Sequence, residues 1–177
     1  MSKARLATVW LDGCSGCHMS FLDMDERLLE LTKEVDLVFS PLVDTKEFPE
    51  QVDVTLVEGA VSSEDDLERI RRIRQRTRIL VALGDCAVTG NVPSMRNIFP
   101  VSEVLDCAYR QNATLKQQIP SEVVPKLLER VIPVHEAVKV DVHIPGCPPS
   151  ADVIYSSLCE LLRGNTPTMD GKTRFGA

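Results

Sequence analysis

Residues 5–17 read RLATVWLDGCSGC and join a short apolar run to a turn that contains two cysteines. The run from Arg5 to Leu11 is mostly apolar, and Asp12-Gly13 after it is a pair typical of turns. The stretch therefore predicts a buried strand that ends directly before Cys14 and Cys17.

The same arrangement occurs twice more along the chain. The apolar run Ile79–Leu83 ends in Gly84-Asp85-Cys86, and Val138–Ile144 ends in Pro145-Gly146-Cys147-Pro148-Pro149. In open sheets of parallel strands, ligands bind outside the carboxyl ends of the strands. We therefore expect four thiols from three turns to converge on one edge of a sheet.

The remaining apolar runs alternate between strand-like and helix-like patterns. We predict further strands over Val35–Phe39 and Val52–Val57, and helices over Ser20–Lys33, Ser63–Arg76 and Ser150–Arg163. This alternation favours an α/β fold, a flavodoxin-like open parallel sheet with helices on both faces and the cysteine turns at the carboxyl ends of its strands. We expect a single domain over residues 1–177, interrupted by an irregular insertion at about 89–133 with at most two short helices.

Composition narrows the class of protein. The chain has 177 residues, 44% of them hydrophobic and 26% charged, a formal net charge of −6 and a pI of about 5.1. An acidic chain is not expected to bind nucleic acid. It has no run long enough for a membrane span and no signal-peptide pattern, so we expect a cytoplasmic protein. In a reducing compartment, six cysteines indicate metal or redox chemistry rather than disulfides.

Four converging thiols suit a cubane iron–sulfur cluster, because such a cluster takes four thiolate ligands. Cys14, Cys17, Cys86 and Cys147 are the predicted metal and cofactor ligands. Two alternatives stay open. A dithiol redox site would use the first pair alone, and a structural zinc site usually shows two Cys-x-x-Cys knuckles, whereas the second pair here is about sixty residues apart.

Other reactive residues give weaker signals. Cys159 lies in the last predicted helix and is expected to be a small buried hydrophobe, and Cys107 is expected to be structural. His18 follows the first cysteine turn. Glu58 ends a strand on the cysteine edge, where it is either a proton relay or a plain polar strand end. We assign no other catalytic role to this chain.

Four motifs, taken in order along the chain, carry a family resemblance. They are Trp10-Leu11-x-Gly13-Cys14-x-Gly16-Cys17, Glu58-Gly59-Ala60, Gly84-Asp85-Cys86 and Pro145-Gly146-Cys147-Pro148-Pro149. The sequence resembles the small subunits of nickel–iron hydrogenases and the related 20 kDa iron–sulfur subunit of complex I. The complex I relatives carry adjacent cysteines in the first loop, whereas two residues separate Cys14 from Cys17, as in hydrogenases. Many relatives have Gly-Gly where this chain has Gly90-Asn91.

The resemblance implies the small subunit of a cytoplasmic NAD-reducing hydrogenase with one 4Fe-4S cluster. A partner large subunit would hold the nickel–iron centre, and electrons would pass on to the iron–sulfur and flavin subunits of a diaphorase module that reduces NAD. This chain lacks the Gly-x-Gly-x-x-Gly turn of a dinucleotide site. Whether FMN binds near the cluster is left open. The alternatives are an electron-transfer subunit of a complex I-like or membrane hydrogenase assembly, and a zinc-stabilised interaction domain.

Overall fold

The core of the protein is a five-stranded parallel sheet. The computed structural model describes residues 3–173, and its strands follow the order β2-β1-β3-β5-β7. Their bounds are Ala4–Trp10 for β1, Val35–Phe39 for β2, Val52–Glu58 for β3, Thr77–Leu83 for β5 and Val142–Ile144 for β7. All four strand pairs are parallel. This topology confirms the predicted flavodoxin-like class.

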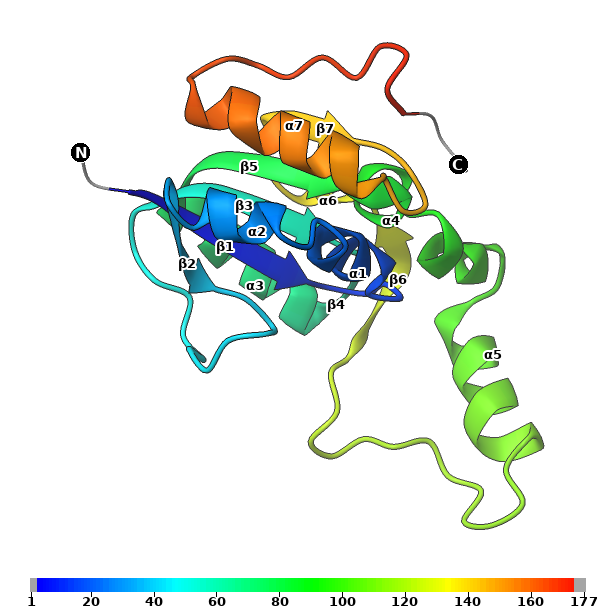
Figure 1. The fold of residues 1–177 in the computed structure, drawn as a ribbon. Helices are drawn as coiled ribbons and strands as arrows, with labels where there is room; N and C mark the ends of the chain where they lie inside the picture. The colour runs from blue at the N-terminus through cyan, green and yellow to red at the C-terminus, as the bar shows by residue number, and fades with distance from the viewer. Residues whose placement is uncertain (1–2, 174–177) are drawn as a thin grey trace.

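Helices cover both faces of the sheet, as Figure 1 shows. One face packs against α1 (Gly16–Leu22), α2 (Arg27–Leu31) and α7 (Ala151–Leu162), and the other against α3 (Glu64–Arg76), α4 (Gly84–Thr89) and α6 (Val134–Ala137). Two buried clusters result because side chains of each strand alternate between the faces. Leu56 and Ile154 belong to the first cluster, and Val57 and Ile70 to the second.

The helix α3 begins where the sequence predicts. The Ser63 hydroxyl accepts a hydrogen bond from the Asp66 amide at 3.1 Å, and the Asp66 carboxylate accepts one from the Ser63 amide at 3.0 Å. This reciprocal pair is a capping box, which satisfies two otherwise unpaired backbone donors. Ile70 and Ile73 are buried on the inner face.

The predicted helix over Ser20–Lys33 is wrong in its extent. The structure has two short helices instead, and the first already begins at Gly16 within the cysteine turn. Asp25 between them has a φ of 49°, a left-handed conformation that a helix does not continue through. At the break, the side chain of Met24 packs into the core, where it is buried.

The last strand is also shorter than predicted. The apolar run predicts extended structure over all of Val138–Ile144, but only Val142–Ile144 pairs with β5. The Asp141 side chain accepts a hydrogen bond from the Leu80 amide at 2.9 Å, so a carboxylate oxygen occupies the place of a strand carbonyl. The preceding residues Val134–Ala137 form α6.

The insertion at 89–133 is more ordered than predicted. It contains η1 (Val92–Ile98), α5 (Val101–Asp106) and η2 (Cys107–Gln111), followed by the strand β6 (Leu127–Ile132). The strand pairs antiparallel with β4 (Val61–Ser63), in a separate two-stranded sheet. Its residues LLERVI lack a regular alternation, so their pattern does not indicate a strand.

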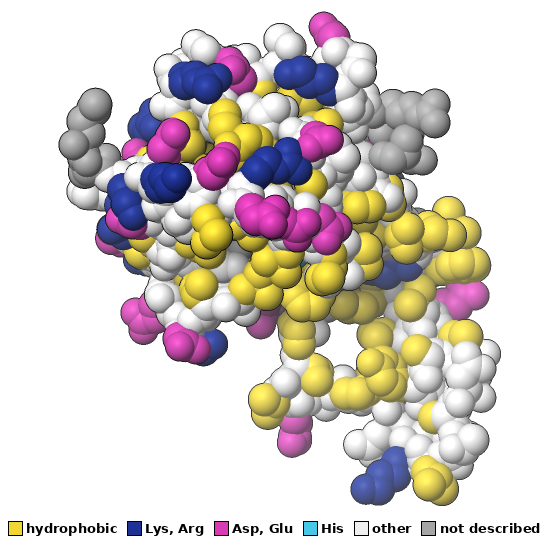
Figure 2. Space-filling view, viewed as in Figure 1, with side chains coloured by type: hydrophobic (Ala, Val, Ile, Leu, Met, Phe, Trp, Pro, Cys, Tyr) yellow, Lys and Arg dark blue, Asp and Glu magenta, His cyan; other side chains and the backbone are white. Residues whose placement is uncertain are grey.

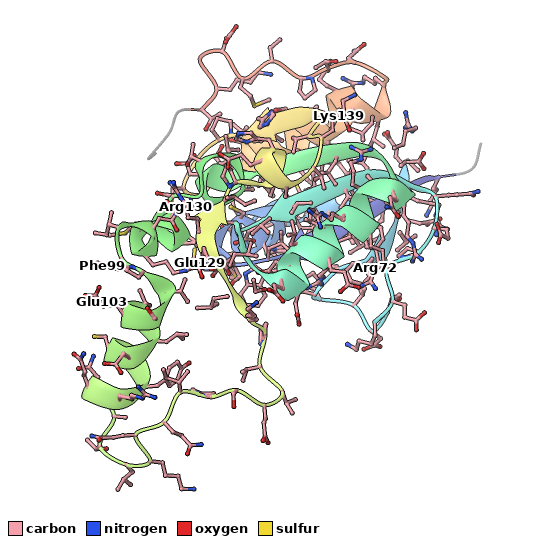
Figure 3. The ribbon with its side chains drawn as sticks, turned by 180° about the vertical axis from the view of Figure 1, so that it is seen from behind. Arg72, Phe99, Glu103, Glu129, Arg130 and Lys139 are labelled. Carbon is pink, nitrogen blue, oxygen red and sulfur yellow. The ribbon has the colours of Figure 1, made fainter. Side chains whose placement is uncertain are left out.

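Residues 101–126, hereafter called the arm, project away from the sheet (Figure 1). Seen from behind, Phe99 lies at the base of the arm and Glu103 on α5, while Glu129 and Arg130 lie on the β6 strand through which the chain returns (Figure 3). Among residues 3–173, no helix is both long enough and apolar enough to cross a bilayer.

Candidate metal centre

Three loops bring the four predicted ligands to one edge of the sheet. Cys14 and Cys17 lie between β1 and the start of α1, Cys86 lies in the first turn of α4 after β5, and Cys147 follows β7. Because these strands are parallel, all three loops leave the same edge (Figure 1). Cys17 is buried, Cys86 half-buried, and Cys14 and Cys147 exposed, and all four are free thiols.

Hydrogen bonds between backbone and side chains tie the loops together. The Asp85 amide donates to the Gly146 carbonyl at 2.9 Å, and the Gly146 amide donates to the Asp85 carboxylate at 2.7 Å. The Ser20 hydroxyl of α1 donates to the Pro149 carbonyl at 2.6 Å. Each loop is therefore held by another loop of the site rather than by its own strand alone.

Gly84 allows the first and second cysteine loops to approach each other. Its φ is +80°, and a Cβ atom at this position would lie 2.2 Å from the Cys17 sulfur and 3.5 Å from the Gly146 carbonyl oxygen. Only glycine combines this backbone conformation with so close a contact. The glycine before Cys86 thus leaves the space that the Cys17 thiol occupies.

The four thiols influence one another electrostatically. Burial is the main cause that raises the pKa of Cys17 far above its usual value, and the charges of Glu58 and of the other three cysteines add to it. Burial likewise raises the pKa of Cys86 to about 11, followed by the charges of Cys14 and Cys147. The loops have therefore converged closely enough for cysteines of different loops to affect the pKa values of Cys17 and Cys86.

This donor set fits an iron–sulfur cluster. Four thiolates that repel one another in a partly buried site require positive charge for all of them to ionise, and the irons of a cluster supply it. Among the described residues, no group of three or more His, Cys, Asp or Glu side chains is arranged to hold a single metal ion.

Beside the cysteines lies a buried polar chain that the sequence indicates only in part. Glu58 is 2% exposed and His18 is 6% exposed. The Glu58 carboxylate accepts a hydrogen bond from the His18 amide at 2.9 Å and also contacts the His18 ring Nδ1. The ring Nε2 lies 3.0 Å from the Thr8 hydroxyl, which donates to the Ser40 hydroxyl at 2.9 Å.

These contacts link Glu58, His18, Thr8 and Ser40 in one chain of buried side chains. Glu58 is thus a buried hydrogen-bonded residue rather than a plain polar strand end.

The remaining cysteines lie elsewhere. Cys107 is exposed at the junction of α5 and η2. Cys159 is half-buried on α7, where full burial is expected from its sequence, because it lies one helical turn from Tyr155 on a partly exposed side of the helix. His135 and His143 form an edge-to-face ring pair.

Sequence reasoning missed several residues that shape the loops. Trp10 donates from its ring N–H to the Gly13 carbonyl at 3.0 Å and so holds the first cysteine loop, although its side chain remains 43% exposed. Asp85 and Ser20 link loops that are far apart in sequence. The position of Asp85 within a Gly-x-Cys turn was the only signal that could have indicated its role.

Known proteins resemble the chain over nearly its whole length. The NAD-reducing hydrogenase HoxS subunit delta of Cupriavidus necator is 45% identical over 92% of this chain and 80% of its own length. A subunit of the F420-non-reducing hydrogenase vhu of Methanocaldococcus jannaschii is 40% identical over 95% of this chain, but this chain spans only 59% of that protein.

Solved structures agree with this relationship. A chain in the crystal structure of an NAD⁺-reducing NiFe hydrogenase in its H₂-reduced state superposes with a TM-score of 0.94 and 42% identity, over 98% of this chain and 99% of that chain. A chain of the NiFeSe hydrogenase of Dm. baculatum shares the fold, with a TM-score of 0.63 and 19% identity over 99% of this chain and 70% of its own.

The family model described as NADH ubiquinone oxidoreductase, 20 Kd subunit, matches residues 14–161, from the first cysteine of the site to the end of the last helix. That match includes all three cysteine loops, so the chain belongs to this family. The 45% identity with a hydrogenase subunit makes it a homologue of hydrogenase small subunits.

Proposed function

We propose that the chain is the electron-transfer small subunit of a nickel–iron hydrogenase, with one 4Fe-4S cluster held by Cys14, Cys17, Cys86 and Cys147. The observation that carries the proposal is the convergence of these thiols from three loops, close enough that the charges of the others help to raise the pKa values of Cys17 and Cys86. When bound, the cluster supplies one-electron chemistry. The loops and their glycines would hold the thiols in place.

The relatives support a path for the electrons. The similar proteins include a subunit of an NAD-reducing hydrogenase and a chain of an NAD⁺-reducing NiFe hydrogenase. We therefore propose that electrons pass between a nickel–iron site on a large subunit and a diaphorase module that reduces NAD. The other two cysteines lie on the arm and on α7, which supports a single cluster.

The surface for the large subunit would adjoin the cysteine edge along η1. Polar side chains of η1 face inward: Arg96 donates to the Leu128 carbonyl at 2.9 Å, and Asn97 exchanges two hydrogen bonds of 2.8 Å with the Val131 backbone. Its apolar side chains face outward instead, and Met95 is 68% and Ile98 79% exposed.

This polarity is the reverse of an ordinary surface helix, in which apolar residues face the core. Because the inward hydrogen bonds hold η1 in place, the outward apolar face belongs to the fold itself. Figure 2 shows hydrophobic side chains gathered where the arm meets the body of the domain. An exposed apolar patch of this kind marks an interaction surface.

Glu58 and His18 would hold a proton beside the cysteine site, since the charge of Glu58 acts on Cys17. Their buried contact, extended through the hydroxyls of Thr8 and Ser40, forms a path along which a proton can be held or moved. We assign Glu58 the role of a proton relay within the proposed complex.

A second candidate is an electron-transfer subunit of a complex I-like or membrane hydrogenase assembly. The family model that matches the chain is that of the complex I 20 kDa subunit. Both candidates need the same four cysteines and differ in the partner, so the metal content of the assembled complex distinguishes them. FMN binding near the cluster would show as more flavin released from the complex than its diaphorase subunits account for.

The ligand assignment is tested by substitution within the assembled complex, purified without air. We expect Cys14→Ser and Cys147→Ser to lose most of the iron bound by this chain, because each removes one of four thiolates. Cys159→Ser is the matched control and should retain the iron and the hydrogen-dependent reduction of NAD. Equal iron in all three variants would refute the assignment.

A further inference from the structure

The turn of residues 90–92 reaches two cysteines of the site from one side. The Asn91 side-chain amide lies 3.6 Å from the Cys147 sulfur, within hydrogen-bonding range for a sulfur acceptor. The backbone amide of Val92 donates to the Cys86 thiol and lowers its pKa, against the larger effect of burial. One short turn therefore directs two N–H groups at sulfurs that belong to different loops.

The turn is held rigidly by its own hydrogen bonds. The Gly90 amide donates to the Cys86 carbonyl at 2.9 Å, and the Ser94 hydroxyl donates to the Asn91 carbonyl at 2.7 Å. Asn91 itself has a positive φ of 30°. The side-chain amide is thus presented to Cys147 by a fixed backbone.

An N–H dipole directed at a thiolate sulfur affects the two redox states of a cluster unequally. Reduction adds one electron and one negative charge to the cluster and its thiolates, and no bond breaks. The dipole stabilises the more negative state more strongly, so hydrogen bonds to ligand sulfur raise the reduction potential.

We propose that Asn91 is a positioning residue whose side-chain amide, through Cys147, raises the reduction potential of the cluster. This role rests on the proposed function, in which the cluster accepts an electron from the hydrogen-splitting centre of the partner and passes it on. Asn91 therefore sets how readily this chain accepts electrons, whereas the four cysteines set whether a cluster binds.

The test is an anaerobic redox titration of the purified complex, followed by electron paramagnetic resonance of the reduced cluster. Asn91→Gly removes the amide and retains a residue that suits a positive φ. At a fixed potential we expect the ratio of oxidised to reduced cluster to rise about three- to tenfold. A tenfold change corresponds to about 59 mV for one electron. Asn91→Asp replaces the donor with an acceptor and should shift the potential further in the same direction.

The chain contains a matched control. Asn112 donates its side-chain amide to the Cys107 sulfur at 3.5 Å, in the arm. Asn112→Gly removes the same kind of contact from a cysteine outside the site and should leave the potential unchanged. Iron per chain, measured in every variant, should stay at the level of the unsubstituted complex.

A potential that does not move in Asn91→Gly, with iron retained, would overturn the proposal and leave the proposed function standing. Loss of iron from Asn91→Gly would also overturn it, because Asn91 would then hold the loop rather than tune the cluster. If the unsubstituted complex bound no iron at this chain, the proposed function itself would fall.

Discussion

Replacing Gly84 with alanine should disturb the cysteine site more than a single added methyl group suggests. Two effects add. A φ of +80° costs a residue with a Cβ atom about 1–2 kcal/mol. The new Cβ would also lie 2.2 Å from the Cys17 sulfur, a contact that must be relieved by moving one loop, at a cost of about 1–3 kcal/mol.

The sum predicts a loss of about 2–5 kcal/mol in the free energy of unfolding. For a domain of this size, each kcal/mol lowers the melting temperature by about 2–4 °C. The assay is thermal unfolding of the purified chain, together with iron per chain after anaerobic purification. Iron should fall as well, because the loop that moves carries a predicted ligand.

Gly164 supplies the control for the steric part. Its φ is +83°, but nothing lies within 4 Å of a Cβ built there. Gly164→Ala should therefore lose only about 1–2 kcal/mol and keep its iron. Equal losses of stability and iron in the two variants would refute the argument that Gly84 makes room for Cys17.

Two further predictions concern the scaffold and the partner surface. Burial raises the pKa of Asp141, but a backbone amide and the Arg74 guanidinium lower it by more, so the net pKa is below its usual value. The carboxylate thus adds stability above the pKa of an unfolded aspartate, about 3.9, and loses it as the pH falls through the lower folded pKa. Asp141→Asn should lower the free energy of unfolding by about 1–3 kcal/mol in urea at pH 7. At acid pH the free energies of unfolding of the variant and the parent protein should be more alike. Met95→Glu combined with Ile98→Glu should abolish co-purification of the large subunit without lowering the melting temperature. The control is Leu115→Glu, in the segment after η2, which should leave co-purification intact. If the large subunit still co-purifies with the double variant, η1 is not part of the interface.

The sequence predicted the features that local patterns encode. Apolar runs that end in Gly-x-Cys or Gly-Cys turns placed the ends of β1, β5 and β7, and the parallel class of sheet followed from the alternation with helices. The capping box at Ser63 marked the start of α3 within one residue. These signals are readable because each arises within a few consecutive residues.

What escaped prediction depends on contacts between distant segments. The break between α1 and α2 places Met24 in the core, and β6 forms a strand only because β4 pairs with it. From its sequence neighbourhood, His18 is indistinguishable from an ordinary helix-start or interface residue, since nothing there shows that a carboxylate 40 positions away faces it. The hydrogen bonds of Asn91 and Asp85 were hidden for the same reason.

The most direct test is the metal content of the complex captured, without air, through a tag on this chain. Nickel together with an excess of iron, and loss of the chain's share of iron in Cys147→Ser, is the predicted result. Iron without nickel would contradict the hydrogenase assignment and favour a complex I-like carrier, and zinc alone would mean that the four cysteines stabilise the fold instead of carrying electrons.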